Sequence, residues 1–120
     1  MLELSNDNND SRFIIYADKK IMYRISLSEI IMIEKIGHRI LVHLDKNKNV
    51  CDNIFISENL YDLYNLIRYE GFEYINRSMI VNLNYVVSVS RQDVILKDGS
   101  VLELSTQRKA TFVERIIVGK

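Results

Sequence analysis

Three short polar segments interrupt otherwise apolar runs, and their side chains are of the kind that bind nucleic acids. They span residues 37–39, 76–78 and 105–109, and their polar groups come from His38, Arg39, Asn76, Arg77, Ser78, Gln107, Arg108 and Lys109. Arginine and lysine bind guanine edges or phosphate, asparagine and glutamine pair with adenine, and hydroxyl groups bind phosphate oxygens. Composition and spacing alone favour a plainer interpretation, in which these segments are solvated loops and helix caps.

The potential metal ligands and nucleophiles form no recognisable site. His38, His43 and Cys51 are the only histidine and cysteine residues, and their spacing fits no zinc motif. Cys51 has Lys48 as its only basic neighbour, so a small buried strand residue is favoured over a reactive thiol. The sequence contains no nucleotide-binding, hydrolase or metalloprotease motif. We therefore expect no metal, no cofactor and no enzymatic activity.

The size and composition of the chain indicate one ordinary globular domain. It has 120 residues, of which 48% are hydrophobic and 27% charged, and no apolar run approaches the length of a membrane span. The first residues lack the basic and apolar regions of a signal peptide, so we expect a cytoplasmic location.

The net charge is zero, but it is unevenly distributed. Residues 1–11 carry three acids and no base, which leaves residues 12–120 at +3. We expect residues 1–11 to be a disordered acidic tail and residues 12–120 to be one domain. The mild positive charge of that domain permits phosphate binding without demanding it.

The elements that must position the three polar segments are mostly strands. Strands are expected over residues 13–16, 20–25, 31–36, 39–44, 50–56, 72–75, 79–81, 85–90, 93–96 and 101–104. The Asp98-Gly99 pair predicts a tight hairpin between the last two of them.

Two helices are expected beside these strands. Residues 57–69 predict a helix capped by Ser57, and its apolar face is formed by Leu60, Leu63, Tyr64 and Ile67. A final helix is expected from Gln107 to about residue 118. Its predicted buried stripe is Phe112, Val113, Ile116 and Ile117.

Residues 72–86, FEYINRSMIVNLNYV, closely resemble the signature of the LytTR DNA-binding family. That signature has a Phe, a basic or polar pair before a serine, an apolar triplet, a Val-Asn pair and an aromatic–aliphatic strand start. Residues 94–105 resemble the next hairpin of the family, which ends in a serine before a basic helix. Residues 28–34 resemble its short turn before a strand that ends in Glu. The resemblance covers about residues 12–117.

The resemblance implies a mostly β, elongated antiparallel fold with two short peripheral helices. In such domains loops, rather than a recognition helix, enter successive major grooves on one side of the DNA. The three polar segments fall at the matching positions. The resemblance therefore implies base-edge or phosphate contacts for Arg39, Arg77 and Arg108, and phosphate contacts for Ser78 and Lys109.

Two functions follow from the resemblance. The first is a stand-alone bacterial transcription regulator without a receiver domain, which binds direct-repeat promoter DNA as a homodimer or pair. Its control would come from expression level, dimerisation or a regulatory protein partner. Family members usually carry Arg and His where this chain has Tyr74 and Asn76, which removes up to two cations. The second function is therefore an interaction protein that pairs with another LytTR regulator and binds DNA weakly or not at all.

Overall fold

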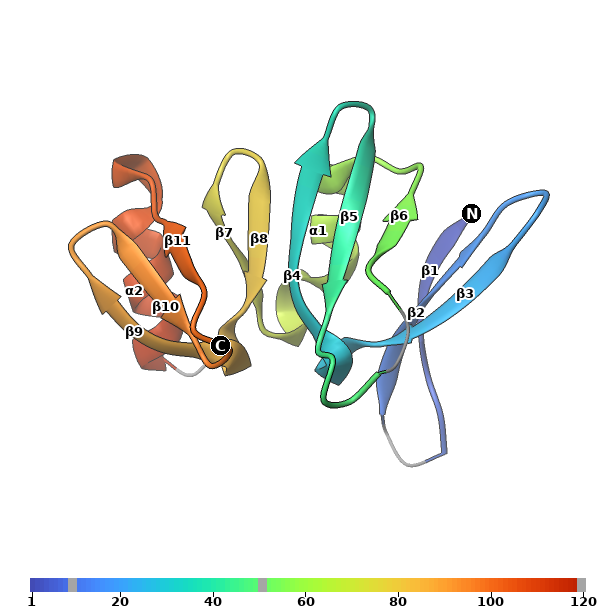
Figure 1. Cartoon of the computed structure of the whole chain (residues 1–120), viewed down its shortest axis with the longest axis horizontal. Coiled ribbons are helices and arrows are strands. Elements are labelled where there is room, and N and C mark those ends of the chain that lie inside the picture. The colour runs from blue at the N-terminus through green and yellow to red at the C-terminus, as the bar shows by residue number, and fades with distance from the viewer. Residues whose placement is uncertain (9–10, 50–51, 119–120) are drawn as a thin grey trace.

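A computed structural model describes residues 1–8, 11–49 and 52–118, which form three antiparallel sheets and two α-helices (Figure 1). The strands are β1 (Leu2–Asn6), β2 (Arg12–Ala17), β3 (Met22–Ser26), β4 (Ile30–Ile36), β5 (Arg39–Leu44), β6 (Ile54–Ile56), β7 (Phe72–Asn76), β8 (Met79–Asn82), β9 (Val86–Ser90), β10 (Asp93–Leu96) and β11 (Val101–Glu103). The helices are α1 (Leu60–Ile67) and α2 (Lys109–Val118), and short 3-10 turns cover Leu27–Glu29, Arg68–Glu70, Leu83–Tyr85 and Thr106–Arg108. This architecture confirms the predicted fold class.

The three sheets follow one another along the longest axis of the molecule (Figure 1). β1, β2 and β3 pair in that order, and the opposite end is a sheet of order β11-β10-β9. The five-stranded sheet between them has the order β6-β5-β4-β8-β7. The overall extents of 43 × 34 × 25 Å make the molecule elongated, as expected.

The central sheet is buried on both faces where β4, β7 and β8 pair. Ile80 belongs to one core, which includes α1 and the N-terminal sheet, while Val81 belongs to a second core with the C-terminal sheet and α2. Successive side chains of a strand point to opposite faces, so an unbroken apolar run is what a strand between two cores requires.

Helix α1 covers the first core with the apolar face that its sequence predicts. Leu60, Leu63 and Ile67 are buried on that face. The predicted cap is wrong: Asn59, not Ser57, begins the helix, because its side-chain oxygen accepts hydrogen bonds from the backbone N–H groups of the first helical turn. The chain leaves this region through Gly71, whose φ of 90° is the left-handed conformation that favours glycine.

Asn82 stabilises the junction between β8 and the turn after it. It is 2% exposed, its amide nitrogen donates to the carbonyl of Ile30 at 2.9 Å, and its oxygen accepts from the N–H of Asn84 at 3.0 Å. The side chain therefore satisfies backbone groups from two distant segments, which lock the end of β8 against the start of β4.

Three further expectations require correction. Instead of a disordered segment over residues 1–11, Leu2–Asn6 form β1, which pairs antiparallel with β2. The strand expected over residues 50–56 is confined to Ile54–Ile56, and Val50 and Cys51 lie outside the described residues. In α2 only Phe112 is fully buried, whereas Ile117 is 76% exposed.

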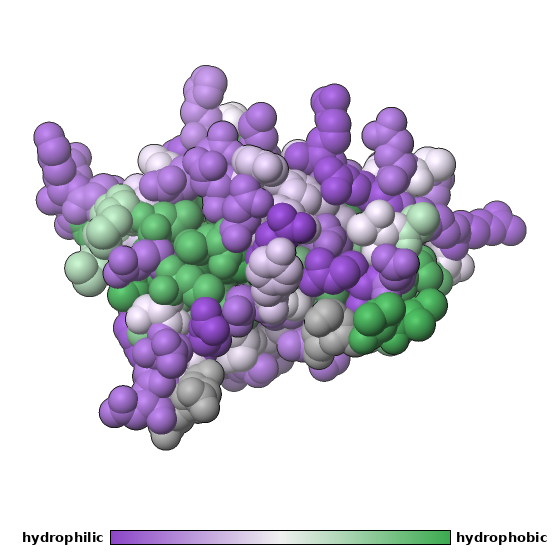
Figure 2. Space-filling view, turned by 180° about the vertical axis from the view of Figure 1, so that it is seen from behind, coloured by the Kyte–Doolittle hydropathy of each residue, from purple (hydrophilic) through white to green (hydrophobic). Residues whose placement is uncertain are grey.

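The burial prediction for α2 failed because the packing of the helix centres on Phe112, which joins the second core beside Ile75 of β7 and Val94 of β10. Ile116, also expected in the buried stripe, is 36% exposed, and Val118 is 75% exposed. These exposed residues lie in the last part of α2, and Figure 2 shows a hydrophobic patch there, at the lower right of the molecule seen from behind. Helical periodicity identifies one face of a helix, but it does not tell how far along the helix the partner extends.

No helix among the described residues is both long enough and apolar enough to cross a membrane.

Candidate nucleic-acid interface

The three polar segments singled out in the sequence lie along one long edge of the molecule. We call them the first loop (residues 37–39), the second loop (residues 76–78) and the third loop (residues 105–109). In Figure 1 they form the upper edge, at the tips of the β4–β5 and β7–β8 hairpins and at the start of α2. Figure 2 shows hydrophilic side chains projecting along this edge from behind.

The first and second loops are held at a fixed spacing by the central sheet. β4 and β8 are adjacent antiparallel strands, with Glu34 opposite Met79. Directly beyond this pair, the backbone N–H of Lys35 donates to the carbonyl of Ser78 at 2.8 Å. Two hairpins that are hydrogen-bonded up to their tips move as one unit, so the two loops have a defined separation.

The third loop is attached to the second by two hydrogen bonds. The N–H of Ser105 donates to the carbonyl of Ile75 at 2.8 Å, and the amide nitrogen of Asn76 donates to the carbonyl of Glu103 at 3.2 Å. The oxygen of Asn76 also accepts from the N–H and the hydroxyl of Ser78. Asn76 therefore shapes the second loop and holds the third beside it.

Two grooves separate the three loops, and Arg77 lines both. The first groove, between the first and second loops, includes Lys35, His38, Arg39, Tyr74 and Arg77 in its lining. The second groove, between the second and third loops, is lined by Asn76, Arg77, Ser78, Glu103, Ser105, Gln107 and Arg108. Seven of the eight predicted site residues therefore line one groove or the other, and Lys109 lines neither.

The cations of the grooves are available to a partner because most of them are exposed. Lys35, Arg39 and Arg77 are exposed, and none of the three forms a salt bridge with another described residue. The guanidinium of Arg39 lies 4.2 Å from the centroid of the Phe55 ring. This cation–π contact holds the guanidinium in a defined orientation.

Arg108 is supported in a similar way by Tyr74, which stands where members of the LytTR family usually carry a basic residue. Its guanidinium lies 4.8 Å from the ring centroid of Tyr74, which is 7% exposed. Burial raises the pKa of Tyr74, while the charge of Arg108 acts in the opposite direction. Tyr74 therefore supplies no charge to the loops, but it positions a cation that comes from the third loop.

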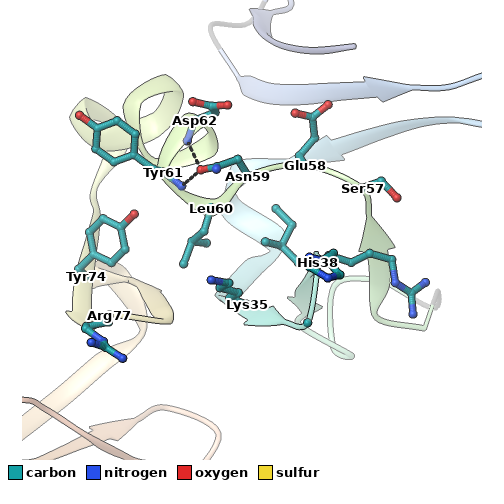
Figure 3. A pocket seen from close by; sticks show the side chains of 13 residues that line it. Lys35, His38, Ser57, Glu58, Asn59, Leu60, Tyr61, Asp62, Tyr74 and Arg77 are labelled. Carbon is teal, nitrogen blue, oxygen red and sulfur yellow. Dashed lines mark hydrogen bonds between the residues drawn. The ribbon is translucent and has the colours of Figure 1, made fainter.

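Acidic side chains also line the grooves and reduce their positive potential. Glu58 and Asp62, at the N-terminal end of α1, line the first groove, and Glu103 lines the second. Figure 3 shows Lys35, His38 and Arg77 on one side of the first groove and Glu58 and Asp62 on the other. The grooves therefore carry side chains of both signs.

Two cations at this edge were missed by the sequence reasoning. Lys35 lines the first groove, and its place two residues before Gly37 at a hairpin tip was the available signal. Arg91 is exposed in the turn between β9 and β10 with a φ of 55°. Its neighbour Gln92 donates to the hydroxyl of Thr106 at 2.9 Å, which places that turn beside the third loop.

No group of three or more metal-ligating side chains that could hold an ion occurs in the part of the chain that the structure describes. His43, considered above as a ligand, is half-buried, and its Nε2 lies 2.7 Å from Oε1 of Glu34. Cys51 lies outside the described residues.

Comparison with known proteins agrees with this geometry. The family model for the LytTr DNA-binding domain matches residues 20–117. A similar solved structure is the LytTr DNA-binding domain of a Bacillus cereus protein described as a methyl-accepting/DNA response regulator, with a TM-score of 0.68 at 15% identity, covering 90% of this chain and 97% of that one. None of the curated proteins compared with the chain matches it. The family match spans most of the sequence, and the chain therefore belongs to the LytTR DNA-binding domain family.

Proposed function

We propose that this protein is a sequence-specific transcription regulator whose three loops bind double-stranded DNA in successive major grooves. The observation that carries the proposal is the alignment of three cation-bearing loops on one edge, with Arg77 between two grooves. Loops fixed by a sheet present side chains to base edges without the ordering cost that a flexible segment would incur.

Within this proposal the eight predicted residues divide by chemistry. Arg39, Arg77 and Arg108 are suited to guanine edges or phosphate because a guanidinium presents a planar fork of donors. His38, Asn76 and Gln107 supply further donors and acceptors toward bases. Ser78 and Lys109 are suited to phosphate, and Lys109 lies at the first residue of α2.

The binding unit that we propose is a pair of copies on direct-repeat promoter sites, acting in the cytoplasm of a bacterium. A single edge of 43 Å spans about 13 base pairs, since B-DNA rises about 34–36 Å per helical turn. Two copies in tandem would multiply the affinity of one copy without any new type of contact. A regulatory protein partner would then act by changing how the copies pair.

The test is a set of DNA-binding isotherms measured by fluorescence anisotropy on a duplex selected from random sequences. Arg77→Ala and Arg108→Ala should each weaken specific binding by about 1–3 kcal/mol if they contact bases. Arg12→Ala is the matched control, because Arg12 is exposed on β2 and pairs only with Glu70 among the described residues, at 3.5 Å. Equal losses on specific and random DNA would reject base contacts for Arg77 and Arg108.

A second function has one specific observation in its favour, the acids that line the grooves. Glu58, Asp62 and Glu103 oppose the approach of phosphate, which fits an interaction protein that pairs with another LytTR regulator. Such a protein would show no salt-sensitive DNA binding. A phosphate binder, by contrast, loses affinity with rising salt at a logarithmic slope of about −0.9 per phosphate contacted. The same isotherms at several salt concentrations therefore separate the two functions.

A further inference from the structure

The turn between β2 and β3 carries two adjacent lysines on a well-defined backbone. Lys19 and Lys20 are exposed, and neither forms a salt bridge with a described residue. The carboxylate of Asp18 accepts from the N–H of Lys20 at 2.8 Å and from the N–H of Ile21 at 3.0 Å. A third bond, from the N–H of Asp18 to the carbonyl of Ile21, closes the turn. The two ammonium groups therefore extend from a fixed position.

Contacts of Met1 connect the end of β2, just before this turn, to the first groove. Met1 exchanges two backbone hydrogen bonds with Ala17, the residue that precedes the turn, at 2.7 and 2.9 Å. The same amino nitrogen of Met1 lies 4.0 Å from Oε2 of Glu58, which lines the first groove. In Figure 1 the turn lies beyond β6 at the right-hand end of the row formed by the three loops. A partner that extends past the first loop along this edge would therefore meet Lys19 and Lys20.

We propose that Lys19 and Lys20 form a fourth DNA contact, to phosphates that flank the segment bound by the three loops. The proposal rests on the DNA-binding function proposed above and extends it. Lysine suits this role because its ammonium is a compact charge on a flexible stem, which neutralises phosphate without requiring a base in a set position. The contact would add affinity and fix the direction in which the domain lies on its site.

The local charge sets the expected size of the effect. The backbone N–H groups of Lys20 and Ile21 lower the pKa of Asp18, so its carboxylate stays charged at neutral pH and offsets one of the two lysines. We therefore expect the turn to act as about one net phosphate contact, which corresponds to a change of about 0.9 in the salt slope. The match to the family model begins at residue 20, so β1, β2 and Lys19 are outside the part that the family model describes.

The experiment compares the full chain with Lys19→Ala/Lys20→Ala on two duplexes that share one selected site. One duplex ends at the footprint of the Lys19→Ala/Lys20→Ala variant, and the other extends about one helical turn, or 10 base pairs, past the end nearest the first loop. The wild-type protein should bind the longer duplex about three- to tenfold more tightly at low salt. The double variant should lose this gain and bind both duplexes equally.

The matched control is Lys46→Ala/Lys48→Ala, which removes the same charge from the segment after β5, at the opposite edge in Figure 1. It should keep the gain from the longer duplex. The inference is overturned if Lys19→Ala/Lys20→Ala keeps the gain, which is the result expected if the turn binds a protein partner through the exposed Ile21 and Met22 instead of DNA. It is also overturned if the control variant loses the gain to the same extent. If the wild-type protein binds neither duplex, the proposed function fails. If Arg77→Ala weakens binding to both duplexes while Lys19→Ala/Lys20→Ala leaves the affinity for both unchanged, the inference fails and the proposed function stands.

Discussion

Arg115 of α2 and Glu73 of β7 form a buried ion pair, with Nη1 of the arginine 2.5 Å from Oε1 of the glutamate. The side chain of Glu73 is 3% exposed and that of Arg115 is 23% exposed. The hydroxyl of Tyr64 and the backbone N–H of Tyr74 also donate to this carboxylate. The pair connects α2, β7 and α1, and it compensates for the poor burial of the second half of α2.

The first prediction concerns the stability that depends on this pair. Arg115→Ala should lower the free energy of unfolding by about 2–4 kcal/mol, because it leaves a buried carboxylate without its cation. Urea unfolding measures the change. The double variant Glu73→Gln/Arg115→Ala should recover part of the loss, since the uncompensated charge is gone. A double variant that is less stable than Arg115→Ala would contradict this account.

The second prediction concerns Tyr74 as a support for Arg108. Tyr74→Leu removes the ring beneath the guanidinium and should weaken DNA binding by about 0.5–2 kcal/mol, the range of cation–π contacts from exposed to desolvated sites, because the ring is buried and the guanidinium is partly exposed. Tyr74→Phe keeps the ring and serves as the control, with little change expected. The isotherms described for Arg108→Ala provide the measurement. In an Arg108→Ala background Tyr74→Leu should have no additional effect on binding, and an undiminished effect there would sink the idea.

The third prediction concerns Asn82, whose buried amide bonds backbone groups of two distant segments. Asn82→Ala should cost about 1–3 kcal/mol of stability because the carbonyl of Ile30 and the N–H of Asn84 lose their partner. Asn84→Ala is a suitable comparison, since Asn84 is exposed and the N–H that Asn82 binds is retained. Chemical unfolding of both variants should show the larger loss for Asn82→Ala, and equal losses would refute the assigned role.

The fourth prediction is a loss of stability at alkaline pH that depends on Tyr85. Burial and the hydrogen bond to Asp45, at 2.8 Å, raise the pKa of Tyr85 to about 12. A tyrosine whose pKa is higher in the folded than in the unfolded chain stabilises the fold fully below the unfolded value of about 10. That contribution is lost as the pH rises from about 10 to about 12.

Thermal unfolding of the wild-type protein and of Tyr85→Phe between pH 8 and 12 tests this relationship. The wild-type protein should lose more stability over the upper part of this range than the variant, which has no hydroxyl to ionise. In an ultraviolet titration Tyr85 should ionise later than an ordinary tyrosine. Parallel stability curves for the two proteins would show that Tyr85 does not cause the alkaline loss.

Local sequence patterns were sufficient to predict the central elements of this fold. The apolar run at Ile80 and Val81, the Asp98-Gly99 turn and the spacing of Leu60, Leu63 and Ile67 each depend on neighbouring residues only. The three loops were found in the same way, because polar groups at the ends of strands are visible in the sequence. That the loops lie on one edge follows from the order of strands in the sheets, which local patterns do not contain.

The expectations that failed depend on contacts between distant segments. β1 was missed because its acidic, asparagine-rich surroundings predict disorder, whereas pairing with β2 provides its order. The burial of Glu73 could not be predicted, since Arg115 lies 42 residues away in the chain. The role of Tyr74 as a support could not be predicted, because its contact with Arg108 joins β7 to the third loop, more than 30 residues away in the chain.

The hydrogen bond between Lys35 and Ser78 has a consequence for how binding specificity can change. The first two loops belong to one ladder, so inserting a single residue into β4 or β8 would turn every following side chain to the opposite face. The spacing between the first two loops is therefore fixed by the sheet. A change in DNA specificity at these loops must come from substitutions of the side chains at their tips. The third loop is held differently, because its hydrogen bonds to Ile75, Asn76 and Gln92 lie outside this ladder. A register-preserving substitution at the tips of the first two loops is therefore the change that would alter specificity without disturbing the scaffold.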